Sequence, residues 1–350
     1  TGWHFLDPVV AISVALPAIG GEFAMSAVTM GWVASSYLLA AAVFLLPFGR
    51  LADIHGRKKV FVAGTALFSA ASLLAALAPG TRLLLLARLL QGTGGAMIFG
   101  TGVAILTSVF PPRRRGWVLG INVGATYVGL SLGPFVGGLL TQQLGWRGVF
   151  LLNVPVGLLI LAVVRLKLGR EWADSRGEPF DWQGSLLYSA MLTFFMLGFT
   201  WLPGWRGAVL LLAAAAALPL FVVREARCAH PIFQARLVRG NTVFAFSNLA
   251  ALVNYSATFA IGFLLSLYLQ YLKGLDPRQA GLVLIAQPVV MAAFSPLAGR
   301  LSDRHEPRVV ASLGMALCAA GLLAFIFLGR DTPLAAIVAN LMLVGLGFAL

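Results

Sequence analysis

Asp7 is the acidic residue with the most unusual position. The chain has 350 residues and twelve Asp and Glu, and the other eleven stand in polar segments or at the ends of apolar ones. Burial in an apolar wall disfavours a charged carboxylate, so such a group can take up and release a proton near neutral pH. Asp7 is therefore a candidate for proton coupling, or for binding the charge of a cationic substrate. The alternative is an ordinary acid at the membrane interface, where a helix begins.

Arg88 is a charged residue well inside an apolar run. It lies about seven residues, or ~10 Å, into the run 82–110, where an arginine needs a partner or a water-filled cavity. This position makes Arg88 a functional candidate; the alternative is a side chain that reaches back to the membrane surface. The run around it reads Arg88-Leu89-Leu90-Gln91-Gly92-Thr93-Gly94-Gly95-Ala96.

Residues 49–58, here named the basic segment, combine glycines, cations and one acid. Glycine permits a tight turn and a close helix approach, and an acid at a helix end among fixed cations can form a reversible contact. These types indicate a gate, and the alternative is a solvated loop. The segment reads Gly49-Arg50-Leu51-Ala52-Asp53-Ile54-His55-Gly56-Arg57-Lys58.

The start of the basic segment occurs a second time. Residues 49–55 recur as residues 299–305, at an offset of 250 and with five of seven positions identical, so Asp303 corresponds to Asp53. The second copy departs afterwards, with Glu306 and Pro307 where the first has glycine and arginine. Such a repeat is typical of transporters built from two parallel halves.

A glycine stripe marks the apolar run 116–141. Gly129, Gly133 and Gly137 are spaced four apart, and Pro134 and Gly138 stand beside them. The stripe predicts a helix face that a neighbouring helix can approach closely, and the proline permits a bend. Packing alone is the alternative explanation for this pattern.

Composition shows which elements position these residues. Hydrophobic residues make up 59% of the chain and charged ones 11%, and the mean hydropathy of +0.91 excludes an ordinary soluble globule. Unbroken apolar runs of about twenty residues indicate spanning helices and exclude a barrel. We predict an all-α polytopic membrane protein with spans near 5–21, 29–49, 59–78, 82–110, 116–141, 147–166, 183–202, 206–223, 242–271, 279–299, 309–328 and 333–350.

Basic residues orient these spans. Eighteen of the 25 Lys and Arg lie in loops after even-numbered spans and six in the opposite loops. The positive-inside rule therefore places the former loops and the N-terminus in the cytoplasm, and the net charge of +13 requires no nucleic acid. Two cysteines and no clustered ligands predict no metal site, no catalytic site and no cofactor.

The repeat also organises the domains. Eight spans separate the two copies, whereas two six-helix bundles would place equivalent spans six apart, so two helices are inserted centrally. We predict an N-terminal six-helix bundle at 1–166 and cytoplasmic linkers with two inserted helices at 167–240. The first four helices of the C-terminal bundle follow at 241–350. The remaining spans are expected after residue 350, and the start at Thr1 suggests missing first residues.

Three of these motifs resemble those of the major facilitator superfamily. The basic segment resembles its signature loop, whose residues hold the two bundles together at the cytoplasmic side when the carrier is open outward. The resemblance implies this gating role for Gly49, Arg50, Asp53, Gly56, Arg57, Lys58 and, by repetition, Asp303. The run around Arg88 resembles the fourth-span motif associated with proton transfer. Residues 129–138 resemble the motif that marks antiporters.

Further stretches resemble the fourteen-span drug:proton antiporter family within that superfamily. They are Phe5–Pro17, Trp146–Pro155, Phe180–Gly184 and Gln279–Gly281, although Pro8 departs from the usual threonine. The resemblance implies multidrug efflux: proton-coupled export of small lipophilic or cationic compounds across the inner membrane by alternating access. The expected partners are a small-molecule substrate, protons and the lipid bilayer. A monomer is expected, and a periplasmic adaptor is left open. A superfamily importer or uniporter of a small metabolite is the alternative, ahead of a membrane-embedded enzyme or receptor.

Overall fold

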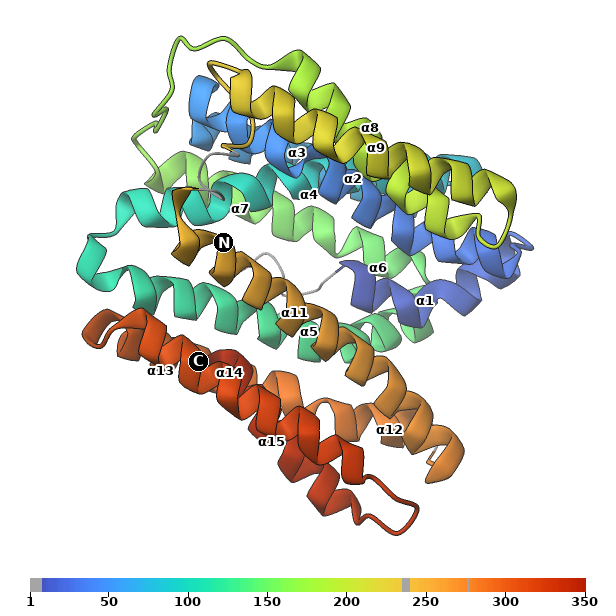
Figure 1. Ribbon diagram of the computed structural model, residues 1–350. Coiled ribbons are helices and arrows are strands. Elements are labelled where there is room, and N and C mark those ends of the chain that lie inside the picture. Colours follow the sequence, from blue (N-terminus) through green and yellow to red (C-terminus); the bar gives the residue numbers. More distant parts are fainter. Residues whose placement is uncertain (1–7, 235–239, 276) are drawn as a thin grey trace. The chain divides into compact units, whose positions relative to one another are not determined.

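The computed structural model describes residues 8–234, 240–275 and 277–350, so Asp7 lies outside the described residues. These residues form helices joined by turns and by longer linkers such as residues 168–181, with no strand among them (Figure 1). The α-helices are α1 Pro8–Glu22, α2 Ala27–His55, α3 Arg57–Ala76, α4 Thr81–Val109, α5 Arg115–Leu144, α6 Arg147–Leu151, α7 Asn153–Lys167, α8 Trp182–Thr200, α9 Trp205–Arg227, α11 Thr242–Leu267, α12 Pro277–Leu284, α13 Ala286–Arg304, α14 Pro307–Ala324 and α15 Leu334–Ala349.

The described part of each of the twelve predicted spans coincides with helix, which confirms the all-α membrane fold. Within the described residues, seven helical stretches are long and apolar enough to cross a bilayer, or eight if the bent pair Pro112–Gly133 and Phe135–Leu144 counts as one span. This number is smaller than the predicted twelve partly because the described part of α1 has 15 residues and α15 has 16. Two of the spans are made of two helices each, α6 with α7 and α12 with α13.

Contacts divide the chain into two units. Beyond its N-terminal residues, unit 1 comprises Val109–Phe135 and Asn241–Leu350, while unit 2 comprises Ala11–Ser108 and Val136–Gly240. The first part of α5 therefore packs with the helices that follow residue 241. The domains expected from the sequence, 1–166, 167–240 and 241–350, divide the chain differently, and they remain a prediction.

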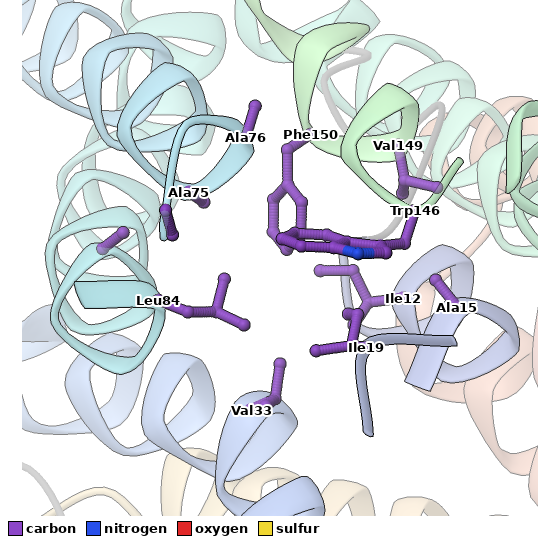
Figure 2. Close-up of a cluster of buried hydrophobic side chains, with 12 residues drawn as sticks. Ile12, Ala15, Ile19, Val33, Ala75, Ala76, Leu84, Trp146, Val149 and Phe150 are labelled. Carbon is purple, nitrogen blue, oxygen red and sulfur yellow. The ribbon is translucent and has the colours of Figure 1, made fainter. Parts of the chain in front are cut away.

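The core of unit 2 gathers around two aromatic rings. Trp146, which precedes α6, and Phe150 within it meet edge to face with ring centroids 5.9 Å apart. Figure 2 shows these rings facing Ile12 and Ile19 of α1 and Leu84 of α4. An aromatic pair of this geometry contributes about 0.5–1.5 kcal/mol beyond its burial. The cluster fixes α1, α4 and α6 against one another.

Small residues allow close packing in unit 1. Gly345 of α15 approaches the backbone of α13, where an added Cβ would lie 2.7 Å from the carbonyl oxygen of Gln287. On α5, a Cβ on Gly124 would lie 3.0 Å from the carbonyl oxygen of Ala292 in α13. Helices whose facing residues lack side chains can come to backbone contact, which is how membrane helices gain packing energy.

The predicted inserted helices α8 and α9 pack side by side in unit 2 (Figure 1). Asp181 caps α8 by accepting a hydrogen bond of 2.9 Å from the backbone N–H of Gly184. The Tyr188 hydroxyl in α8 donates to the carbonyl oxygen of Ala42 in α2, at 3.1 Å. The pair is thereby fixed to the helix that leads into the basic segment.

The basic segment is more helical than the sequence predicts. The predicted spans leave residues 50–58 as a turn, but α2 continues to His55 and α3 begins at Arg57. Gly56 alone separates them, and its φ is +119°. Its backbone N–H donates a hydrogen bond of 2.9 Å to the carbonyl oxygen of Ala52. A glycine at positive φ can end one helix and start the next within a single residue, which is why the loop is so short.

Candidate functional site

Arg57 is the centre of a polar cluster at the basic segment. Its guanidinium donates from Nε to Asp53 Oδ1 at 2.9 Å and from Nη2 to Asp174 Oδ2 at 2.6 Å. Its Nη1 donates to Ser108 Oγ of α4 at 2.9 Å, and its side chain is 13% exposed. Asp53 and Arg57, both expected in the gate, therefore pair with each other across the Gly56 turn, within a larger network.

Residues 168–181, here named the acidic linker, supply the other half of this cluster. Arg50 donates to Glu178 Oε2 at 2.5 Å and to Ser175 Oγ at 2.9 Å. The Lys58 backbone N–H donates to Glu171 Oε1 at 2.8 Å, and its Nζ donates to the carbonyl oxygen of Leu168. The linker thus lies along the whole basic segment.

Backbone hydrogen bonds fix the acidic linker in place. The Arg57 N–H donates to the carbonyl oxygen of Trp172 at 2.8 Å, and the Ser175 N–H donates to that of Asp53 at 3.0 Å. Glu171 also lies over the turn, where a Cβ on Gly56 would come within 2.5 Å of its carboxyl carbon. The structure leaves room at Gly49, where an added Cβ would meet no atom within 4 Å.

The contact of the acidic linker with the basic segment does not follow from the sequence prediction. The predicted role of this segment is a cytoplasmic linker only, without a part in the gate. Its acids Glu171, Asp174, Glu178 and Asp181 recur every three or four residues, opposite in charge to the basic segment. That complementarity was the available signal.

Glu178 is the acid of the linker that contacts both Arg50 and His230. It accepts from Arg50 and lies 2.9 Å from His230 Nδ1. Hydrogen bonds with Arg50 and with His230 lower the pKa of the Glu178 carboxyl below its usual value, and partial burial opposes them. Glu178 is therefore an ionised carboxylate that joins the basic segment to the chain after α9.

Asp303, the second-copy acid, forms a different contact in unit 1. Its carboxylate accepts the backbone N–H of Gly116 on Oδ1 and that of Trp117 on Oδ2, both at 2.8 Å. These are unsatisfied donors of the first turn of α5, where the helix dipole favours a negative charge. The Arg300 guanidinium stacks over the Trp117 ring, 5.4 Å from its centroid. Asp303 thus joins α13 to α5.

A glycine seam accompanies that contact. A Cβ on Gly116 would lie 2.5 Å from the carbonyl oxygen of Gly299, and one on Gly299 would collide with that of Gly116. Gly120 likewise faces the backbone of Ser295. The close approach of α5 to α13 is therefore made by Gly116 and Gly120. In the predicted stripe Gly129, Gly133 and Gly137 are buried, Gly138 is partly exposed, and the side chain of Pro134 lies outside the described residues.

Arg88 is fully buried in unit 2, with 0% of its surface exposed, and it does not reach back to the membrane surface. Its Nε donates to the carbonyl oxygen of Val33 in α2 at 2.7 Å, and its Nη1 to Gln91 Oε1 at 2.5 Å. Gln91 donates in turn to Ser72 Oγ of α3 at 2.7 Å. The guanidinium also lies over the Tyr37 ring, 4.6 Å from its centroid. The arginine therefore joins α2, α3 and α4 in one polar network.

Glu22 and Arg147 form an ion pair at a different end of unit 2. Arg147 donates to both Glu22 oxygens, at 2.7 and 2.9 Å, and Trp146 Nε1 donates to Oε2 at 2.7 Å. Hydrogen bonds from Arg147 and Trp146 lower the pKa of Glu22, against a smaller effect of burial. By the predicted topology this pair lies on the outer side.

The described residues contain no group of three or more His, Cys, Asp or Glu that could hold a metal ion.

These helices and contacts agree with comparisons to known proteins. The profile of the Major Facilitator Superfamily matches residues 9–227 and 248–350. The chain belongs to this superfamily. The fold matches that of the proton:xylose symporter XylE with a TM-score of 0.67 at 16% identity, over 99% of this chain and 77% of XylE.

Several relatives in the superfamily are named for drug resistance or export. The chain is 33% identical over 352 residues to multidrug resistance protein Stp of Mycobacterium tuberculosis, covering 99% of this chain and 65% of Stp. It is 36% identical over 333 residues to cephamycin export protein CmcT of Amycolatopsis lactamdurans, covering 91% and 68%. Riboflavin transporter RibZ of Clostridioides difficile is 27% identical over 339 residues, covering 96% and 73%. The chain thus spans about two thirds of these relatives, and it is a membrane transporter of this superfamily, not an enzyme.

Proposed function

We propose that the protein exports small lipophilic or cationic compounds in exchange for protons, as a multi-pass inner-membrane carrier of the fourteen-span antiporter kind with a cytoplasmic N-terminus. Support comes from relatives named for multidrug resistance and cephamycin export, and from the glycine-proline pattern at 129–138. Its expected partners are the substrate, protons and the bilayer.

The contact of Asp303 with α5 is the observation that carries this proposal. In the predicted repeat, α5 belongs to the first half of the chain and α13 to the second. A carboxylate on two backbone N–H groups is a contact that can break and re-form without unfolding either helix. Alternating access requires such a contact between halves, made in one state and lost in the other.

Substitution of Asp303 tests that gate. Asp303→Asn removes the charge from a contact of about 1.5–3 kcal/mol, which should shift a two-state equilibrium about ten- to a hundredfold. Dye transport into inverted vesicles should fall sharply at normal expression, while Glu306→Gln, an exposed neighbour, should leave it unchanged. Normal efflux by Asp303→Asn would contradict the gate.

Asp7 is proposed to carry the coupling proton, with Arg88 setting its proton affinity. Asp7→Asn mimics the protonated state permanently, so it should eliminate gradient-driven efflux in proteoliposomes. Asp7→Glu should keep part of the activity with a displaced pH optimum, because the group can still titrate. Asp331→Asn, exposed before α15, serves as the matched control. Full gradient-driven transport by Asp7→Asn would contradict the mechanism.

Uptake or uniport of a small metabolite is the second candidate, and the likeness to RibZ favours it. The two functions differ in direction and in coupling. An exporter exchanging with protons concentrates substrate in acidified inverted vesicles, and collapsing the proton gradient releases the substrate. A uniporter equilibrates substrate at the same rate with or without the gradient.

A further inference from the structure

Glu225 is a buried acid at the end of α9 that the gate does not use. Its sequence position predicts an acid of a polar segment, but 2% of the residue is exposed and none of its side chain. Burial of a carboxyl group requires that each oxygen find a partner or that the group lose its charge. The surroundings of its two oxygens therefore decide its state.

The two oxygens of Glu225 are in different positions. Oε2 accepts the backbone N–H of Phe233 at 2.9 Å, which holds the segment after α9 against that helix. Oε1 is buried without a hydrogen-bond donor. A Cβ added to Gly184 would collide with both Glu225 Oε1 and Asp181 Oδ2, each at 2.3 Å. The two carboxyl oxygens are therefore neighbours above the backbone of Gly184. Glu225 thus faces Asp181.

One guanidinium serves these two carboxyl groups. Arg224 donates to Asp181 Oδ2 at 2.6 Å and to Oδ1 at 2.8 Å, whereas its distance to Glu225 Oε1 is 3.6 Å. It also donates to Gln183 Oε1 at 3.1 Å. Its hydrogen bonds are therefore committed to Asp181 and Gln183.

Asp181 is the ionised member of the pair. Burial raises the pKa of its carboxyl, but hydrogen bonds from Arg224 and from the Gly184 N–H outweigh that effect and hold the pKa below its usual value. An ionised Glu225 would then put a second negative charge beside it, on an oxygen that no donor reaches. A neutral Glu225 instead supplies the missing donor, since its O–H can point to Asp181 Oδ2.

We propose that Asp181 and Glu225 share one proton: Glu225 is a carboxylic acid at neutral pH and donates its O–H to the Asp181 carboxylate. This proton-binding site lies on the inserted helix pair and is independent of the proton proposed for Asp7. When pH rises, the O–H bond of Glu225 breaks, the proton passes to water, and the site gains one negative charge. Repulsion then loosens the hold of Glu225 on residues 229–234.

The charged groups around the pair are few within the described part of unit 2. On α9 they are Arg224 and, further along, Arg227, followed by the thiol of Cys228; from the start of α8 comes Asp181. From the segment after α9, His230 pairs with Glu178 of the acidic linker, which Arg50 of α2 also binds. Both linkers that flank the inserted pair therefore meet near this proton.

Infrared spectroscopy tests the proton directly on the purified full-length protein in lipid. A neutral carboxyl group has a C=O band distinct from that of a carboxylate. Glu225→Gln should remove one carboxylic-acid band at neutral pH, and Glu306→Gln should remove none. Asp181→Asn keeps the helix cap but frees Arg224 for Glu225, so it should also remove the band. If both Glu225→Gln and Asp181→Asn retained the band, the proposal would be overturned.

Cys228, half-buried at the end of α9, reports on the consequence. In a background with Cys318 and any further cysteine replaced, a maleimide should label Cys228 in the native protein and in Glu225→Gln at equal rates near pH 6. Near pH 9 the native protein should react several-fold faster, because glutamine keeps both hydrogen bonds and cannot ionise. A rate ratio that stays constant with pH would overturn the release of this segment.

Discussion

At the scale of single residues, Arg88 shows how a charge is accommodated inside an apolar helix. Its guanidinium donates from Nε to the backbone carbonyl oxygen of Val33 and from Nη1 to Gln91, and it stacks on the Tyr37 ring, so it has three different kinds of partner. The planar fork of arginine can make these contacts at once, which an ammonium group cannot. The network therefore depends on the shape of the group as well as on its charge.

Arg88→Lys should lower proton-driven dye efflux at least tenfold. Lysine keeps the charge but loses at least one charge-assisted hydrogen bond, of about 1.5–3 kcal/mol. Efflux rates in inverted vesicles at matched protein levels measure the effect. Arg82→Lys, exposed at the start of the same helix, is the control and should transport normally. Equal transport by both variants would show that charge alone suffices at position 88.

Glu178 gives the acidic linker a defined pH dependence. Its pKa lies below the ordinary value of 4.5 in the folded protein. Its contribution to the stability of the folded linker is therefore complete above pH 4.5 and is lost as the pH falls through the lowered pKa. Hydrogen exchange of residues 169–178, corrected for intrinsic rates, should therefore stay slow from neutral pH down to about pH 5 and rise in stronger acid. Glu178→Gln should exchange quickly throughout. Slow exchange in that variant would show that Arg50 does not hold the linker.

At the scale of elements, Gly56 sets the geometry of the gate. A single residue at positive φ turns the chain from α2 to α3, which brings Asp53 and Arg57 within 2.7 Å across the turn. The second copy has Glu306 and Pro307 at this point, and α14 begins at the proline. Asp303 therefore has no cation four residues later, and it binds the start of α5 instead.

Gly56→Ala should destabilise the protein by about 1–3 kcal/mol, because alanine is strained at this φ. Its Cβ would also meet the Glu171 side chain and displace the acidic linker. Gly49→Ala is the matched substitution in the same segment, where the added methyl meets open space. It should be neutral or stabilise the helix by up to about 1 kcal/mol. Thermal unfolding in detergent compares the two, and equal melting temperatures would contradict the role of Gly56.

At the scale of the whole molecule, the charge asymmetry predicts which side each loop faces. Cysteines are introduced by Arg176→Cys in the acidic linker and Gln143→Cys at the end of α5, both exposed positions, in a background without other cysteines. A membrane-impermeant maleimide should label position 143 in intact cells and position 176 after permeabilisation. Labelling of position 176 from outside at the same rate would reverse the topology.

Much of the fold follows from local patterns, and much of the site does not. Apolar runs of bilayer length locate the helices because the signal for each helix lies within its own consecutive residues. The pair Asp53 and Arg57 is similarly local, four residues apart across a glycine. The meeting of Arg50 with Glu178 joins residues 128 positions apart, and no periodicity encodes it. The burial of Glu225 likewise depends on the chain folding back at Phe233, so the sequence places it among surface acids.

The seam between Gly116 and Gly299 has a consequence for speed. Where two helices meet without side chains, no interlocking layers have to be lifted past one another, so sliding meets little friction. The activation enthalpy of parting α5 from α13 then falls mainly on the two hydrogen bonds of Asp303. Under the proposed mechanism, breaking these two bonds limits how fast the helices part, and a methyl group at Gly299 would force them apart because its Cβ would collide with the carbonyl oxygen of Gly116.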